Sequence, residues 1–292
     1  MITHSYTSEE LRSLIARAET LLGQNLDNLI QKHVNSRGLP TPQQNSHRLI
    51  EQLLLLRHAA ANPDDALAVG IAAVAGAEVG GILDVFEEWR NDPVWPEFQR
   101  ALNSPEEYLH AVTTLSVASA LRLHHPGTQL VASGGPTQSA DLRMVVTDEH
   151  SLAVEVKTSP DFGSRGRGMT QSEAFVAIER ALRKASKGFD GQLKDGHPCV
   201  LVIGGFNIDS ETFNALGNAA GAVLAKRPER RNLLAIVVSD ISIVAKQEAG
   251  RPTVELAHKT RIRSNDRYSG PLRFVGEWAG EWHLVKAPTT AS

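Results

Sequence analysis

The sequence predicts an α/β protein of two domains, with a helical N-terminal domain in residues 1–95 and an α/β domain in residues 96–292. Three observations support this prediction. Apolar residues recur at helical spacing in the first domain, whereas apolar runs typical of strands alternate with helical segments in the second. Between the two patterns, the segment 91–96 contains two prolines, which interrupt regular structure and suggest a domain boundary.

The N-terminal domain is expected to contain three helices. The first begins after the N-cap signal at Thr7 and continues until the glycine- and proline-rich segment 38–42 interrupts it. The second helix covers residues 46–61, and the third extends from 63–65 towards Trp89.

The second domain alternates between helical and extended segments. The expected order is a helix at 104–123, a short strand at 129–132, two strands within 141–157, a helix at 172–189, a strand at 199–204, a helix at 211–225 and a strand at 233–239. The chain after Leu256 is less regular, and Trp278 and Trp282 are expected to pack on the sheet.

The two strands within 141–157 are expected to place three charged side chains together. Side chains alternate along a strand, so Glu155 and Lys157 lie on one face while their apolar neighbours enter the core. The polar turn 147–150 is short enough for a hairpin, which would bring Asp141 close to Glu155. The alternative is that Asp141 is a polar residue at a strand entrance, and that Glu155 and Lys157 form a solvated strand face.

The segment that contains Asp141, Glu155 and Lys157 reads SADLRMVV…LAVEVKTSP and resembles the motif of the PD-(D/E)xK nuclease superfamily. Ala140 stands where that family has a proline. The family fold is restriction-endonuclease-like, with a central mixed sheet flanked by helices in the order helix, three-stranded meander, crossover helix and further strand. The expected order of elements agrees with this fold. The resemblance covers about residues 104–240 and leaves the helical N-terminal domain unexplained.

The resemblance implies a divalent-metal site on the paired strands. Asp141, Glu155 and the backbone carbonyl of Val156 would provide the oxygen ligands that Mg²⁺ prefers, with Mn²⁺ as a substitute. Lys157 would orient or deprotonate the attacking water, or stabilise the transition state. The sequence does not choose among these roles of the lysine.

The family often adds an acidic residue from the helix before the meander. Glu107 is the best match to this residue, with Glu106 second, because Glu107 lies in line with a core-facing stripe through Ala111 and Leu115. Ser104 and Glu107 also match a capping box, in which Glu107 would only bind the backbone amide of Ser104. A metal ligand and a helix cap therefore both remain open for Glu107.

Four basic residues are candidates for binding nucleic acid. Arg165 and Arg167 lie in the glycine-rich loop 163–168 after the motif strand, where they would contact a phosphate backbone. Lys184 and Lys187 lie on the next helix, where related nucleases often carry a helper lysine or glutamine. The alternatives are an exposed loop and a solvated helix face.

The composition excludes several classes of protein. A hydrophobic content of 41% with 22% charged residues is typical of a globular protein, and the formal net charge of −3 argues against a protein that coats DNA. Cys199 is the single cysteine and excludes an intramolecular disulfide, so a reducing cytoplasm is expected. No signal peptide is expected at the N-terminus. The Ala- and Gly-rich stretch 66–85 carries Glu78 and predicts a packed helix instead of a membrane span.

Three functions fit the sequence, in decreasing order of support. The first is a Mg²⁺-dependent endodeoxyribonuclease of restriction or phage defence, with DNA as partner, RNA left open and no membrane. The second is a non-catalytic protein of the same fold that binds DNA or a protein partner, with the N-terminal helices as an assembly module. The third, a small-molecule α/β enzyme, lacks a nucleotide-binding loop or catalytic triad. Double-strand cutting with one site per chain would favour a homodimer.

Overall fold

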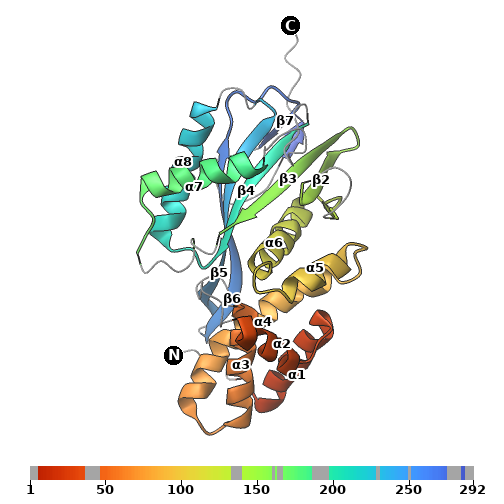
Figure 1. Cartoon of the computed structure of the whole chain (residues 1–292), viewed down its shortest axis with the longest axis vertical. Coiled ribbons are helices and arrows are strands. Elements are labelled where there is room, and N and C mark those ends of the chain that lie inside the picture. The colour runs from red at the N-terminus through yellow and green to blue at the C-terminus, as the bar shows by residue number, and fades with distance from the viewer. Residues whose placement is uncertain are drawn as a thin grey trace. The chain divides into compact units, whose positions relative to one another are not determined.

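The protein is described by a computed structural model that covers residues 6–36, 47–132, 140–159, 162, 167–185, 197–227, 231–248, 251–274 and 284–286. In these residues the expected α/β class is confirmed, with eight helices and a mixed sheet of six strands (Figure 1). The chain forms two compact units, of which the first comprises 1–115 with 242–257 and the second 116–241 with 258–292. The division between the units, at residues 115 and 116, lies within the helix Tyr108–His124. That residues 1–95 and 96–292 are separate domains stays a prediction.

The first unit is formed mainly by helices. These are α1 Ser8–Leu22, α2 Leu26–Ser36, α3 Arg48–Ala61, α4 Ala66–Trp89 and α5 Trp95–Leu102, and α6 Tyr108–His124 begins in this unit and ends in the second. Their buried apolar residues recur at helical spacing, as in the run Leu49, Ile50, Leu53 and Leu56 of α3. The predicted helical character of this region is therefore observed within the described residues.

The helix expected to extend from Thr7 to the segment 38–42 is two helices, α1 and α2. A capping box starts α1, since Thr7 Oγ1 accepts from the amide of Glu10 at 3.2 Å and Glu10 Oε2 accepts from the amide of Thr7 at 2.7 Å. α1 ends at Gly23, whose φ of 67° lies in the left-handed region that glycine adopts without steric cost. The expectation of one continuous helix is wrong, because the apolar spacing resumes after a break of only three residues, 23–25.

α4 is the packed helix expected at 66–85. At Gly76 an added Cβ would lie 2.6 Å from the ring of Tyr6, so only glycine allows this close approach. Glu78 on the same helix is 1% exposed and accepts two hydrogen bonds from Arg48, one of them from Nη2 to Oε2 at 2.9 Å. By length and composition α4 is the one helix among the described residues that could cross a membrane, and half of its most apolar stretch is buried.

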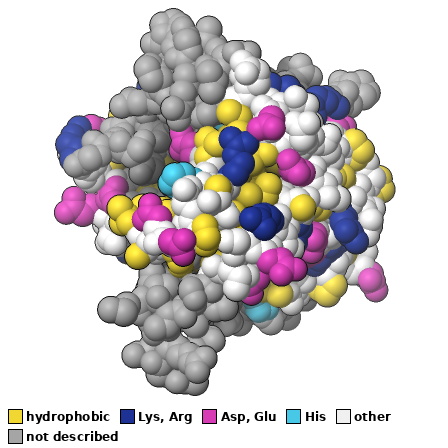
Figure 2. All heavy atoms as spheres, turned by 90° about the horizontal axis from the view of Figure 1, so that it is seen from below, with side chains coloured by type: hydrophobic (Ala, Val, Ile, Leu, Met, Phe, Trp, Pro, Cys, Tyr) yellow, Lys and Arg dark blue, Asp and Glu magenta, His cyan; other side chains and the backbone are white. Residues whose placement is uncertain are grey.

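Apolar side chains also reach the surface of the first unit. Leu55, Leu67 and Ile71 on α3 and α4 are exposed, Leu67 by 72%. Seen from below, hydrophobic side chains lie at the surface among separate basic and acidic ones (Figure 2). Scattered apolar residues of this kind are normal for a protein surface and do not by themselves define a binding site.

A short helix, α5, begins where the sequence suggested an interruption. Pro96 lies in its first turn, where the missing amide would have no partner within the helix in any case. The prolines of the segment 91–96 therefore lie at the start of a helix. From the sequence alone, a helix start and a domain boundary are both compatible with two prolines.

The mixed sheet has the strand order β1-β2-β3-β4-β5-β6. The strands are β1 Gln129–Leu130, β2 Leu142–Thr147, β3 His150–Thr158, β4 Cys199–Phe206, β5 Leu233–Glu248 and β6 Arg251–Ser264. The pairs β1–β2 and β2–β3 are antiparallel, and the pairs β3–β4 and β4–β5 are parallel. The expected hairpin of β2 and β3 is confirmed, with Leu142 opposite Val154.

Helices α7 Gln171–Ala185 and α8 Ser210–Lys226 lie side by side on one face of the sheet (Figure 1). The apolar cluster on this face includes Ile178, Cys199, Leu201, Ile203 and Leu216. Partners in a parallel pair share a face, and Glu155 is opposite Leu201 while Lys157 is opposite Ile203. Glu155 and Lys157 therefore lie on the face that α7 and α8 cover, and their apolar neighbours in β3 lie on the other.

The chain after Leu256 contains more regular structure than expected. β6 continues to Ser264, and a two-stranded antiparallel sheet pairs β7 Leu272–Phe274 with β8 Leu284–Lys286. Trp278 and Trp282, which were expected to pack on the sheet, lie outside the described residues.

Candidate functional site

The hairpin of β2 and β3 brings Asp141 and Glu155 together. Asp141 immediately precedes β2, and the pairing of Leu142 with Val154 places it beside Glu155 on the neighbouring strand. The amide of Val156 donates to Asp141 Oδ2 at 2.7 Å, which fixes the carboxylate against β3. The approach of the two acidic residues expected from the hairpin is thus observed.

Glu155 is a buried acid, with 0% of its side chain exposed. Lys157, whose side chain is 24% exposed, donates a hydrogen bond from Nζ to Glu155 Oε1. The second oxygen, Oε2, is buried and has no hydrogen-bond partner among the described residues. A buried carboxylate oxygen without a partner is costly to the fold, and such oxygens usually have a reason in a ligand or in chemistry.

The surroundings of Glu155 oppose its ionisation. Burial, and next the nearby charge of Asp141, raise the pKa of the Glu155 carboxyl to about 8, while Lys157 acts in the opposite direction. An added positive charge would relieve both effects, because it would attract the two carboxylates and occupy the free side of Oε2. The electrostatics of the pair therefore favour a cation at this position.

The oxygen atoms present fit Mg²⁺ better than an ion that needs many protein ligands. No group of three or more His, Cys, Asp or Glu residues that could hold a metal occurs within the described ranges. Mg²⁺ usually keeps several waters and takes only one or two carboxylates, which Asp141 and Glu155 would provide. Val156, whose carbonyl is the third expected ligand, lies between Glu155 and Lys157 in β3.

Glu107 is not in the same compact unit as the strand residues. It is exposed in the turn before α6 and belongs to the first unit. The hydroxyl of Ser104 donates to Glu106 Oε2 at 2.9 Å. Neither the expected metal ligation nor the alternative capping box of Glu107 has a described contact in support, and its role as a ligand stays a prediction.

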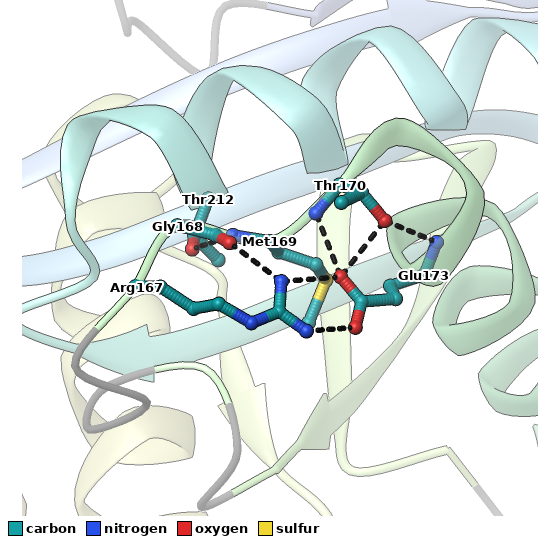
Figure 3. A network of polar contacts seen from close by, with 6 residues as sticks. All are labelled: Arg167, Gly168, Met169, Thr170, Glu173 and Thr212. Atoms are coloured by element: carbon teal, nitrogen blue, oxygen red, sulfur yellow. Dashed lines mark hydrogen bonds and ion pairs between the residues drawn. The ribbon is translucent and has the colours of Figure 1, made fainter.

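Of the four basic candidates, Arg167 and Lys184 are described, whereas Arg165 and Lys187 lie outside the described residues. Arg167 is exposed and pairs with Glu173 through two hydrogen bonds of 2.6 and 3.1 Å (Figure 3). The hydrogen bond from Arg167, followed by those from Thr170, lowers the pKa of the Glu173 carboxyl to about 2. Arg167 therefore has a partner at the start of α7, and its contact with nucleic acid stays a prediction.

The segment that contains Arg167 is fixed to both helices of this face. Thr170 and Glu173 form reciprocal hydrogen bonds of a capping box that starts α7. The amide of Met169 donates to Thr212 Oγ1 of α8 at 2.9 Å (Figure 3). The described part of the segment, 167–170, is thus held by hydrogen bonds to both α7 and α8.

A cavity of about 430 Å³ opens beside Lys157 on the face covered by α7. Its walls include Lys157, Phe162, Met169, Glu173, Arg180, Lys184 and Ile203. Lys157 and Lys184 were candidates from the sequence, but the cavity itself was not predicted. A signal was present, since Ala177, Ala181 and Lys184 follow one side of α7 at helical spacing and the two alanines leave room above the sheet.

Comparisons with protein-family models, with curated proteins and with solved structures find no match to this chain. A proposal of function therefore depends on the residues, the topology and the geometry described above.

Proposed function

We propose that this protein is a divalent-metal-dependent nuclease with a restriction-endonuclease-like core, which hydrolyses phosphodiester bonds. The observation that carries the proposal is the buried Glu155 beside Asp141, with one carboxylate oxygen unpaired among the described residues. The element order α6, β1-β2-β3, α7 and β4 supports it, because this order is that of the superfamily that the motif resembles.

Asp141, Glu155 and the carbonyl of Val156 are the groups that would hold the ion, Mg²⁺ or Mn²⁺. When bound, the ion would neutralise charge on the phosphate under attack and make water a better nucleophile. Asp141 is oriented for this task by the amide of Val156, and Glu155 is held by Lys157 on its other oxygen. The two carboxylates need little rearrangement to act together.

Lys157 would contact the substrate from the rim of the cavity. Its ammonium group lies between the buried Glu155 and the space beside α7, with part of the side chain open to solvent. A cation at this point would donate to a phosphate oxygen as negative charge grows in the transition state. Orientation or deprotonation of the attacking water is the other role that the lysine would serve.

The proposed setting is a DNA-cutting enzyme of restriction or phage defence in the cytoplasm. The basic side chains beside the site, Lys157, Arg180 and Lys184, support an anionic substrate in a chain whose formal net charge is −3. If one chain contributes one site, a cut through both strands would favour a homodimer.

Cleavage of plasmid and linear DNA with Mg²⁺ or Mn²⁺ tests the proposal. The change Glu155→Gln keeps the shape of the side chain but removes its charge, so we expect a loss of at least about 100-fold in the cleavage rate. Asp148→Asn, an exposed acid in the turn between β2 and β3, is the matched control and should cut like the unchanged protein. Absence of metal-dependent cleavage, or full activity of Glu155→Gln, would contradict the proposal.

A second candidate is a non-catalytic protein of this fold that binds DNA or a protein partner. The direct pairing of Lys157 with Glu155, and the presence of only two carboxylates at the site in the described residues, favour it. Calorimetry with Mn²⁺ separates the candidates. A binding isotherm that Asp141→Ala abolishes would contradict an inert scaffold, whereas no binding would support it.

A further inference from the structure

The cavity beside Lys157 has the size of a small-ligand site and is next to the candidate carboxylates. Its volume of about 430 Å³ falls within the range of roughly 300 to 1,000 Å³ that is usual for pockets that bind organic ligands. Its walls come from the end of β3, the chain that follows it, α7 and Ile203 of β4. A ligand bound at the β3 side of the cavity would lie in contact with Lys157.

The charged residues of the cavity favour an anion. Lys157, Arg180 and Lys184 are basic, and the last two are one helical turn apart on α7. Glu173 is the acidic residue of the cavity, and it forms two hydrogen bonds with Arg167 (Figure 3). The positive charge of Arg167, which does not line the cavity, therefore offsets the negative charge of Glu173. The remaining positive charge suits a phosphate group.

Other residues that line the cavity are apolar. Phe162 and Met169 are 6% and 5% exposed, and Ile203 is fully buried. Ala177 and Ala181 of α7 also line the cavity, and their small side chains leave space in it. An aromatic ring beside a thioether provides a surface on which a flat base can stack, and such stacking is common where proteins bind single strands.

We propose that this cavity binds one unpaired nucleotide of the strand that the enzyme cuts. Its phosphate would contact Lys157, Arg180 and Lys184, and its base would lie against Phe162 and Met169. This inference rests on the proposed nuclease function and adds a substrate class to it. A base that is paired in a duplex is stacked between its neighbours and would have to leave the stack to reach the apolar wall, so the preferred substrate is a single strand, a strand end or a flipped nucleotide.

Binding of small ligands to the metal-free protein tests the cavity without any cleavage. Isothermal titration would compare a nucleoside 5′-monophosphate, the same nucleoside without phosphate, and inorganic phosphate. We expect the monophosphate to bind at least about tenfold more tightly than either fragment, because only it uses both the basic and the apolar walls. Equal affinity for inorganic phosphate, or no binding of the monophosphate, would overturn the proposal.

Variants of α7 locate the binding. Arg180→Gln and Lys184→Gln should each weaken the binding of the monophosphate by about tenfold, since both side chains are exposed and line the cavity. Arg183→Gln is the matched control, because Arg183 is exposed on the same helix and does not line the cavity. Ala177→Leu fills the cavity and should abolish binding of the monophosphate while inorganic phosphate still binds. An equal effect of Arg183→Gln and Arg180→Gln would overturn the assignment.

Cleavage assays separate this inference from the nuclease proposal. With Mg²⁺, the unchanged protein should cut a single-stranded oligonucleotide at least about tenfold faster than the same sequence in a blunt duplex. Equal rates would reject the cavity proposal and leave the nuclease proposal in place. Tight binding of the monophosphate without cleavage of any nucleic acid would reject the nuclease proposal and leave nucleotide binding by the cavity in place.

Discussion

A polar pair in the second unit, with one member buried and the other half-buried, makes the fold sensitive to acid. Ser239 in β5 is fully buried, and its hydroxyl lies 2.5 Å from Nε2 of His258 in β6. Burial lowers the pKa of His258 to about 4, below the ordinary 6.5. Between about pH 4 and pH 6.5 the imidazole is therefore neutral in the folded protein, although it would be charged in the unfolded chain.

The change His258→Gln is expected to reduce the acid sensitivity of the fold. Below pH 6.5 the unfolded chain binds a proton that the folded chain refuses until about pH 4, so stability falls as the pH falls through this window. Between pH 7 and pH 4.5 the loss that depends on His258 should be about 2 kcal/mol, because most of the pKa difference takes effect within this range. Urea unfolding at pH 7 and pH 4.5 measures it.

The control for this experiment is His150→Gln, at a half-exposed position where β3 begins. It should lose as much stability on acidification as the unchanged protein. Identical acid losses in His258→Gln and the unchanged protein would show that the buried pair does not control the response.

At the scale of elements, the start of α8 supports both the sheet and the cavity. Asp209 caps this helix, as its Oδ1 accepts from the amide of Thr212 at 2.8 Å and its Oδ2 accepts from the hydroxyl of Thr212 at 2.6 Å. The same hydroxyl accepts from the amide of Met169. The cap therefore fixes one wall of the cavity through a chain of hydrogen bonds.

Asp209→Ala should lower the free energy of unfolding by about 1–2 kcal/mol, the usual cost of losing an N-cap. It should also weaken nucleotide binding in the cavity, because Thr212 loses the acceptor that orients it towards Met169. Asp209→Asn keeps a capping oxygen and should restore most of the stability. Chemical unfolding measures the first effect, and an unchanged midpoint in Asp209→Ala would contradict it.

The sequence predicts an element well where the spacing of apolar residues determines it, and poorly where a single residue determines where the element begins or ends. The hairpin at β2 and β3 and helices α7 and α8 follow from apolar spacing. The break at Gly23 depends on the φ angle of a single residue. The helix start at Pro96 was missed because proline occurs both in the first turn of helices and in loops. The place of Asp141 beside Glu155 was predictable because the turn between the strands is short.

The spacing of small residues along α7 was a signal for the cavity, but the sequence alone did not show which strand residues complete it. Ile203 reaches it only through the parallel pairing of β4 with β3, which the apolar run of β4 does not specify. The burial of Glu155 also depends on this pairing and on α7 and α8 above it. Alternation along β3 gave the correct face, but it could not show whether that face is solvated or covered.

At the scale of the whole molecule, net charge and local charge point in different directions. The chain has a formal net charge of −3, while three basic residues gather at the cavity. We therefore expect single-stranded DNA to bind with a weak dependence on salt, a slope of roughly −0.7 in log K against log salt, because the three basic residues contact a single phosphate. Fluorescence anisotropy across a salt series measures the slope. A slope several times steeper would indicate a longer basic track than the cavity provides.

The arrangement of the candidate site along the chain has a consequence for redesign. The paired carboxylates lie on the β2–β3 hairpin, whereas the cavity is formed almost entirely by the single stretch from 157 to 184 that follows it. One contiguous exchange of residues 158–184 would therefore replace most of the recognition surface and leave Asp141, Glu155 and Lys157 intact. In evolutionary terms, substrate preference in such a molecule can drift by recombination of a short gene segment, without any change in the chemistry beneath it.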